Sequence, residues 1–225
     1  MTWKRKLFDA SLFFHKLIAD KFGNAVYTTL KSDKFYKPLH DYEPRAAALE
    51  LISREIYRYS TAGAAAELGV YRGDFARKIN HFFPDKKLYL FDTFEGFDGR
   101  DTAVDQKKNF SAGSQDFSQT SVPLVLEKME HGENCIVKKG WFPDTADGID
   151  ESFCFASLDV DLYQPTLAGL RFFYPRLSPG GYLMIHDFNN GEYPGVRQAV
   201  KEFCTENHAG YVCLPDFCGS AVIAR

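Results

Sequence analysis

Residues 64 to 74 read Ala-Ala-Ala-Glu-Leu-Gly-Val-Tyr-Arg-Gly-Asp, and this stretch decides the fold. Its apolar first half has the composition of a buried strand. The two glycines that follow the acid predict a tight turn, and helical spacing begins directly after the second of them. A strand that passes through such a turn into a helix is the repeating unit of an α/β protein with a parallel sheet.

Strand and helix patterns alternate along the rest of the chain. Apolar runs bounded by turn residues predict five strands, at 64–70, 87–92, 135–139, 152–159 and 182–187. Helical spacing predicts helices between them, at 73–83, 123–130, 166–177 and 195–205. Two short apolar runs, 211–215 and 220–224, predict an antiparallel hairpin at the carboxyl end. The pattern as a whole predicts a doubly wound, mostly parallel, Rossmann-like sheet of seven strands.

The amino-terminal part has a different pattern. Apolar residues recur at helical spacing between Leu7 and Ile18, and again from Ala46 to Tyr59 behind Pro44. We therefore expect residues 1–60 to form a helical cap and residues 61–225 to form the main part of a single domain. A polar stretch from about 98 to 121 is longer than a usual connection, which predicts an active-site lid or a mobile substrate loop.

Composition excludes several classes of protein. The chain has 225 residues, is 45% hydrophobic and 25% charged, and has no apolar run near the roughly 18 residues of a membrane helix. The net charge of -3 and the dispersed lysines and arginines disfavour nucleic acid and membrane partners. Asp9, His15 and Asp20 interrupt what would be the apolar core of a signal peptide. Five cysteines without a Cys-x-x-Cys pair predict reduced thiols in a cytoplasmic protein.

Acids and glycines at the first two predicted strand ends indicate a nucleoside site. Glu67 precedes Gly69 and Gly73, and no cluster of phosphate-cradling amides accompanies them. This arrangement favours a zwitterionic or cationic nucleoside such as S-adenosylmethionine over a pyrophosphate. Asp92, at the end of the second strand, can accept both ribose hydroxyl protons. The alternatives are an ordinary strand-to-helix turn at the glycines and a helix cap at Asp92.

Two acidic stations follow the fourth and fifth predicted strands. Asp159 and Asp161 form the first station, and His186 and Asp187 form the second. The carboxyl ends of parallel strands meet at the ligand crevice of an open sheet, so we expect these side chains to lie close together. Such a cluster can hold a divalent metal. Asp161 is expected to make an outer contact or to cap the helix that follows.

Six blocks then occur in one order between residues 64 and 203. They are Glu-Leu-Gly-Val-Tyr-Arg-Gly (67–73), Phe-Asp-Thr-Phe-Glu-Gly-Phe (91–97), Gly-Trp-Phe-Pro-Asp-Thr (140–145), Leu-Asp-Val-Asp-Leu-Tyr-Gln-Pro-Thr (158–166), Tyr-Pro-Arg-Leu-Ser-Pro-Gly-Gly (174–181) and Gly-Val-Arg-Gln-Ala-Val-Lys-Glu-Phe (195–203). In this order they resemble the macrocin O-methyltransferase (TylF-type) family. Its members are class I, S-adenosylmethionine-dependent enzymes, and characterised ones use a divalent metal, usually magnesium, to methylate sugar or phenol hydroxyls of natural products.

The resemblance implies roles for particular residues. The cofactor would be bound by the motif positions Glu67, Gly69, Tyr71, Gly73, Asp92, Thr93, Gly140, Trp141 and Asp159. Gly140 and Trp141 fall where the adenine pocket is usually built, although Trp141 could equally be a packing aromatic beside Phe142. Asp159 would be the first metal ligand and a candidate base. The methyl acceptor would be a hydroxyl of a small molecule.

The second station departs from the family pattern, because His186 stands where an acid is common. Magnesium prefers oxygen ligands, whereas imidazole suits transition metals. His186 could therefore join Asp159 and Asp187 in holding a softer metal such as manganese, iron or zinc. It could instead be a metal-free general base, or merely pack at the strand end.

The leading prediction is an O-methyltransferase assisted by a divalent metal such as Mg or Mn. The alternatives are a metal-independent methyltransferase that uses His186 or Asp159 as the base, and a non-catalytic S-adenosylmethionine-binding protein. The aromatic-rich amino-terminal helix predicted for residues 3–18 could serve a homodimer interface.

Overall fold

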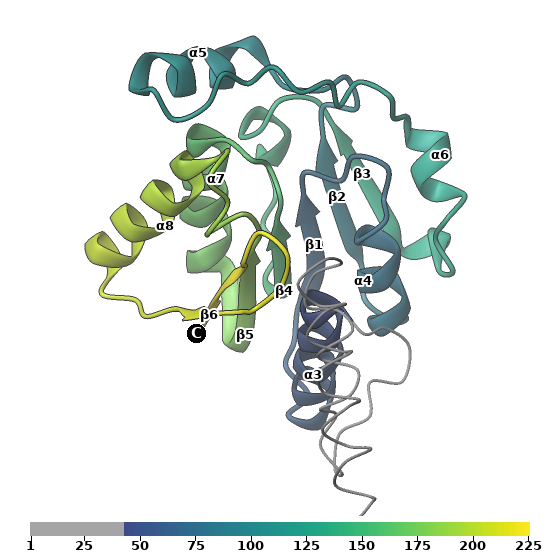
Figure 1. Cartoon of the computed structure of the whole chain (residues 1–225). Helices are drawn as coiled ribbons and strands as arrows, with labels where there is room; N and C mark the ends of the chain where they lie inside the picture. The colour runs from purple at the N-terminus through teal and green to yellow at the C-terminus, as the bar shows by residue number, and fades with distance from the viewer. Residues whose placement is uncertain (1–42) are drawn as a thin grey trace, which may run out of the picture.

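The computed structural model describes residues 43–225 of the chain (Figure 1). The helix predicted for residues 3–18, the homodimer interface attributed to it and most of the predicted cap lie outside the described residues. The division into a cap and a main domain at residue 60 stays a prediction.

One sheet of seven strands organises the described part, in the order β3-β2-β1-β4-β5-β7-β6. Strands β1 to β5 run parallel to one another, and β7 is antiparallel to both β5 and β6. Their bounds are β1 Ala64–Leu68, β2 Leu88–Asp92, β3 Cys135–Lys139, β4 Phe153–Leu158, β5 Leu177–Ile185, β6 Val212–Cys213 and β7 Ala221–Ala224. The predicted doubly wound sheet with a carboxyl-terminal antiparallel hairpin is confirmed.

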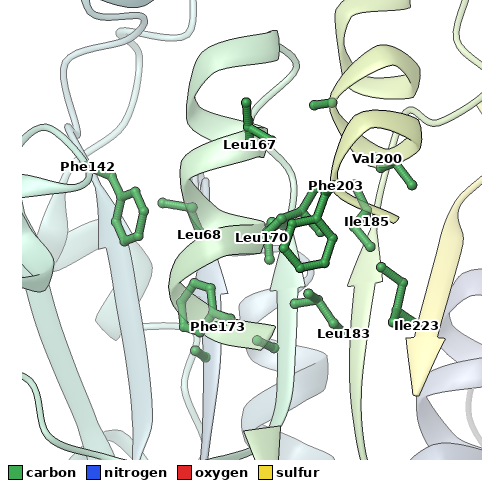
Figure 2. Packing of buried hydrophobic residues seen from close by; sticks show 14 of the residues in the cluster. Leu68, Phe142, Leu167, Leu170, Phe173, Leu183, Ile185, Val200, Phe203 and Ile223 are labelled. Carbon is green, nitrogen blue, oxygen red and sulfur yellow. The ribbon is translucent and has the colours of Figure 1, made fainter. Parts of the chain in front are cut away.

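Helices cover both faces of the sheet, as the alternation of strand side chains requires. Ala64, Ala66 and Leu68 of β1 belong to the core under α7 and α8, while Ala65 belongs to the core under α3 and α4. Figure 2 shows the first of these cores. The helices are α3 Pro44–Arg58, α4 Ala76–Phe82, α5 Gly99–Lys108, α6 Val122–Leu126, α7 Tyr163–Phe173 and α8 Pro194–Asn207. None of the helices in this part of the chain is long and apolar enough to cross a membrane.

The fifth strand differs from its prediction. It begins at Leu177, five residues earlier than expected, and the preceding helix spans Tyr163–Phe173 instead of 166–177. The Pro-Gly-Gly segment that indicated a turn lies inside the strand, where the pairing shifts from Phe153 with Leu177 to Phe155 with Tyr182. The turn residues therefore form an irregularity within a strand, a use of glycine and proline that local pattern does not separate from a true turn.

The predicted lid, residues 98–121, contains a helix that the sequence analysis missed. Asp98 caps α5 by accepting a hydrogen bond of 2.9 Å from the Arg100 amide. Asp105 of α5 is fully buried, and its Oδ1 accepts a hydrogen bond of 3.0 Å from the amide of Tyr163, the first residue of α7. The helix is attached to the domain largely through such polar contacts, so an apolar periodicity did not reveal it.

Helix α3 reaches the carboxyl end of β4 through one buried side chain. Arg45 donates from Nη1 to Asp159 Oδ2 at 2.7 Å and from Nη2 to Ser157 Oγ at 3.0 Å. Its guanidinium lies 3.7 Å from the ring centre of Phe75. This helix thus packs on the sheet and also supplies a cation to the end of β4.

Gly69 occupies a position where a side chain is excluded. Its φ is +84°, and an added Cβ would lie 2.0 Å from the carbonyl oxygen of Asp159. We expect Gly69→Ala to lower the free energy of unfolding by about 2 kcal/mol or more, because both the backbone conformation and the contact become strained. Chemical denaturation measures this loss. Gly210→Ala is the matched control, since nothing lies within 4 Å of its added Cβ. A loss as small as that of the control would contradict the close packing of the two strand ends.

Removal of the Arg45 charge should destabilise the fold. Arg45→Leu is expected to lower the free energy of unfolding by about 2 to 4 kcal/mol, because it leaves acidic partners without their cation. The control is Arg58→Leu, since the Arg58–Glu55 pair has side chains 66% and 39% exposed and should contribute less than about 1 kcal/mol. Equal losses in the two variants, measured by urea denaturation, would refute a structural role for the Arg45 pair.

Candidate active site

A cavity of about 930 Å³ opens at the carboxyl ends of the parallel strands. In Figure 1, α5 lies above these strand ends. This edge is where open α/β sheets bind ligands. All predicted site residues except Gly73 line the cavity, namely Glu67, Gly69, Tyr71, Asp92, Thr93, Gly140, Trp141, Asp159, His186 and Asp187. The structure therefore brings these residues together in one cavity, and their roles stay predictions.

Glu67, on β1, is a buried acid with an unused oxygen. The residue is 1% exposed, and its Oε2 has no hydrogen-bond partner among the described residues. Burial raises the pKa of Glu67 well above its usual range, against the opposing charge of Arg45. A buried acceptor without a partner is unfavourable, so the position suits a ligand that brings its own hydrogen-bond donor.

Asp92, at the end of β2, organises the turn after β1. Its Oδ2 accepts hydrogen bonds from the amides of Val70 and Tyr71 at 2.7 and 2.8 Å, and its Oδ1 accepts one from Phe94 at 2.6 Å. The hydroxyl of Thr93 holds the turn after β2, since it donates to the Gly96 carbonyl at 2.6 Å. Asp92 is thus held rigidly at the cavity wall, and its oxygens keep acceptor capacity for a ligand.

The two glycines of the first turn have packing reasons that the sequence analysis did not foresee. The backbone of Gly69 faces the backbone of Asp159 rather than only the cavity. Gly73, with a φ of +78°, faces Val125 and Met129 and does not line the cavity. Gly73, which the resemblance assigned to the cofactor site, therefore lies outside the cavity wall, and its role in binding stays a prediction.

Trp141 follows β3 and is tied to α5. Its Nε1 donates a hydrogen bond of 2.9 Å to Asp101 Oδ2, and the guanidinium of Arg100 lies 3.8 Å from its ring centre. The neighbouring Phe142, in contrast, packs in the core against Phe91. Trp141 is therefore not the plain packing aromatic that was the alternative interpretation.

The two acidic stations meet at one point. His186 Nδ1 lies 3.1 Å from Asp159 Oδ1 and 2.6 Å from Asp187 Oδ2. Each of the three residues offers one ligand atom, and these atoms lie within 4.8 Å of one another. Two carboxylates and one imidazole at this spacing fit a divalent cation, and the nitrogen donor fits manganese or another transition metal better than magnesium.

Each charged group in this cluster shifts the pKa of its neighbours. Burial alone would raise the pKa of Asp159, but the Arg45 guanidinium and His186 outweigh it and hold this pKa well below its usual range. Burial alone would lower the pKa of His186, but hydrogen bonds to Asp159 and Asp187 raise it to about 10. In this arrangement His186 is an imidazolium at neutral pH, and its proton lies between the two carboxylates.

Further acids and a thiol surround the cluster. Burial, together with repulsion from Asp159 and Asp187, raises the pKa of Asp161 well above its usual range. Asp216, in the turn between β6 and β7, accepts hydrogen bonds from the Ser220 amide and hydroxyl, and its Oδ2 lies 4.0 Å from His186 Nε2. Burial and the charge of Asp187 raise the pKa of Cys218 to about 12. The sequence analysis identified the segment 216–219 only as a hairpin turn.

Arg45 was also missed. It stands at the second position of a helix in the segment predicted as a cap, and no motif surrounds it. Several buried acids in one crevice require a cation nearby to balance their charge. The sequence alone does not show which of its arginines lies close to them.

The outer part of the cavity is built from two loops. Asn190, Glu192 and Tyr193, in the loop after the second station, line it. Gln115 and Phe117 of the predicted lid line it as well, and Gln115 Nε2 donates to Glu192 Oε2 at 3.1 Å. Phe217, 85% exposed, borders the same opening.

Comparison with known proteins finds two O-methyltransferases among the relatives of this chain. The chain is 30% identical over 160 residues to the mycinamicin III 3''-O-methyltransferase of Micromonospora griseorubida, which covers 65% of this chain and 62% of that protein. It is 30% identical over 156 residues to a rhamnosyl-tetracenomycin-C 4'-O-methyltransferase of Streptomyces olivaceus, covering 63% and 58%. The chain thus spans less than two thirds of the length of the curated relatives that it matches.

Solved structures show the same fold. The O-methyltransferase NovP superimposes with a TM-score of 0.68 at 22% identity, covering 81% of this chain and 79% of that one. The calicheamicin methyltransferase CalS11 gives 0.65 at 20% identity, covering 80% and 78%. The fold is that of class I methyltransferases.

The sequence profile described as Macrocin-O-methyltransferase (TylF) matches residues 43–210, which include every strand of the parallel part of the sheet and all the residues predicted to form the site. The chain therefore belongs to the macrocin O-methyltransferase (TylF) family.

Proposed function

We propose that this chain is an S-adenosylmethionine-dependent O-methyltransferase that acts on a hydroxyl of a small molecule, either a sugar or a glycosylated natural product, with the help of a divalent metal. One observation carries the proposal. The unpaired Oε2 of Glu67 and the anchored carboxylate of Asp92 share one cavity with the cluster of Asp159, His186 and Asp187. The named activities of the two curated relatives support a sugar hydroxyl as the acceptor.

The residues on the β1 and β2 side fit the cofactor. The free oxygen of Glu67 would accept a hydrogen bond from the ammonium group of the methionine part. Asp92 would accept from the ribose hydroxyls, in a position set by three backbone amides. Gly140 and Trp141 would border the adenine. When bound, S-adenosylmethionine supplies an activated methyl group, and the chain's task is to hold an acceptor oxygen in line with it.

The residues on the β4 and β5 side fit a divalent metal. Asp159 and Asp187 would supply oxygen ligands, and His186 would supply a nitrogen once it has lost its proton. A metal bound there would lower the pKa of an acceptor hydroxyl. Asn190 donates to Asp187 Oδ1 at 2.7 Å and would orient that carboxylate toward its partners.

The metal-free alternative has weaker support. A general base must be able to take up a proton near neutral pH. His186 already carries one, because its pKa is raised to about 10 by its two carboxylate neighbours against the effect of burial. Asp159 is ion-paired with Arg45 and has a depressed pKa, which makes it a poor base. Methyl transfer that continues in the presence of a chelator would favour this alternative.

A non-catalytic role as an S-adenosylmethionine-binding protein is the other alternative. Cofactor binding alone does not require a second acidic station beside the first, which is why catalysis has the stronger support. The cytoplasmic location stays a prediction.

Asp92→Ala is expected to weaken S-adenosylmethionine binding by at least about tenfold, because it removes the ribose acceptor and releases the turn at Val70 and Tyr71. Isothermal titration calorimetry measures the dissociation constant. Asp150→Ala, at an exposed acid, is the control and should leave it unchanged. No saturable binding to the folded wild-type chain would refute the proposed function, whereas unchanged binding by Asp92→Ala would refute only the ribose role.

Metal affinity should rise with pH. A metal must displace the His186 proton, so below the folded pKa of about 10 each unit of pH increase should raise the apparent Mn²⁺ affinity by up to about tenfold. Electron paramagnetic resonance of free Mn²⁺ between pH 6 and pH 8 measures this slope. In His186→Asp the slope should fall by about one proton per metal, and the preference should shift toward Mg²⁺. Equal slopes in the two proteins would show that His186 is not a ligand.

A further inference from the structure

One carboxylate oxygen of Asp101, in the first turn of α5, makes no hydrogen bond within the described part of the chain. The residue is 6% exposed and lines the cavity. Its Oδ2 accepts the indole N–H of Trp141 at 2.9 Å, while its Oδ1 is buried and has no hydrogen-bond partner among the described residues. Leaving a buried carboxylate oxygen unpaired is unfavourable, so the atom requires an explanation.

The unpaired polar atoms of the described chain separate into two kinds. Asp105 Oδ2 and Thr145 Oγ1 belong to residues that do not line the cavity. Arg45 Nε, Glu67 Oε2 and Asp101 Oδ1 belong to residues that do. Arg45 and Glu67 lie near the acidic cluster of β4, since both interact with the charge of Asp159. Asp101 instead contacts the segment after β3.

The order of the strands explains why Asp101 lies in a different part of the cavity from Arg45 and Glu67. In the sheet, β3 and β2 lie on one side of β1, and β4 and β5 lie on the other. With the ribose at Asp92 of β2 and the reacting methyl near Asp159 after β4, the nucleobase extends toward β3. Gly140, Trp141 and Asp101 line the cavity there.

We propose that Asp101 reads the nucleobase of the cofactor, with Oδ1 accepting a hydrogen bond from the exocyclic amino group of adenine. The inference rests on the proposed function. A carboxylate without its proton only accepts hydrogen bonds, so it pairs with the 6-amino group of adenine and repels the 6-oxo group of hypoxanthine. The lid helix would thus select the base, in addition to covering the cavity.

The surroundings hold Asp101 in place for this role. Asp98 binds Arg100 through two hydrogen bonds of 2.8 Å, and Arg100 stacks on the Trp141 ring. Trp141 in turn donates to Oδ2 of Asp101, which leaves Oδ1 as the free acceptor. Burial raises the pKa of Asp101 to about 6, so the group is largely ionised at neutral pH. The acceptor is therefore preset before a ligand arrives, which strengthens discrimination.

The test compares two ligands whose bases differ along the edge read. Hypoxanthine has an oxo group at position 6 and a proton on N1, where adenine has an amino group and a lone pair. Dissociation constants of S-adenosylhomocysteine and S-inosylhomocysteine are measured by calorimetry for the wild-type chain, Asp101→Asn and Asp105→Asn. The wild type should prefer the adenosyl ligand by at least about tenfold. In Asp101→Asn the amide can still accept from Trp141 and can donate to the 6-oxo group, so the preference should disappear or reverse. Asp105→Asn, in the same helix and equally buried but away from the cavity, should keep the wild-type ratio.

The ratio of the two dissociation constants distinguishes recognition of the base from a structural effect. A variant that merely displaces α5 weakens the binding of both ligands by the same factor. A wild-type ratio below about threefold overturns the inference without any variant, as does an unchanged ratio in Asp101→Asn. Asp101→Ser, which also removes the carboxylate, is the second variant if the first does not fold, and its ratio should approach one. Binding of neither ligand to the wild type would overturn the proposed function as well.

Discussion

The carboxylate of Asp159 lies between two cations, and the site is arranged about it. Arg45 reaches Oδ2 from a helix on one face of the sheet, and His186 reaches Oδ1 from the neighbouring strand end. Three buried or half-buried charges at such distances are stable only because each has a partner, since an unpaired ion in a low-dielectric interior is strongly unfavourable. The strand end, the helix and the second acidic station therefore depend on one another.

The pairing of Asp159 with His186 affects how the site would bind a metal. His186 Nδ1 lies 3.1 Å from Asp159 Oδ1 and 2.6 Å from Asp187 Oδ2, so in the proposed metal site a proton on His186 and a metal would compete for the same two carboxylates. Burial and the anionic neighbours of Asp161 raise its pKa well above the usual range, and a nearby cation would lower it again. In the proposed metal site, the imidazole of His186, rather than a third carboxylate, would make the metal affinity sensitive to pH near neutrality.

How far the sequence predicted the fold can be followed in two elements. The strand 135–139 was predicted with the bounds that the structure has, because an apolar run there is flanked by unambiguous turn residues. Strand β5 was predicted to begin too late. Pro179 and Gly180 have the same local sequence pattern whether the chain turns or merely shifts its pairing register. Helix α5 was missed, because its attachment is made by the buried acids Asp101 and Asp105, and acids at those positions look like surface residues.

The sequence by itself determined the alternation of strands and helices in a mostly parallel sheet and placed acids at the strand ends. Their meeting in one crevice followed, because parallel topology brings the carboxyl ends of the strands to one edge. Only the tertiary structure decided which charges pair there. Arg45 and Asp159 are 114 residues apart, and Asp216 approaches His186 from the terminal hairpin. Such contacts depend on where helices and loops pack on the sheet, and a local sequence pattern does not predict that packing. The same holds for Asp101, whose one bonded and one free oxygen exist only because α5 packs on Trp141.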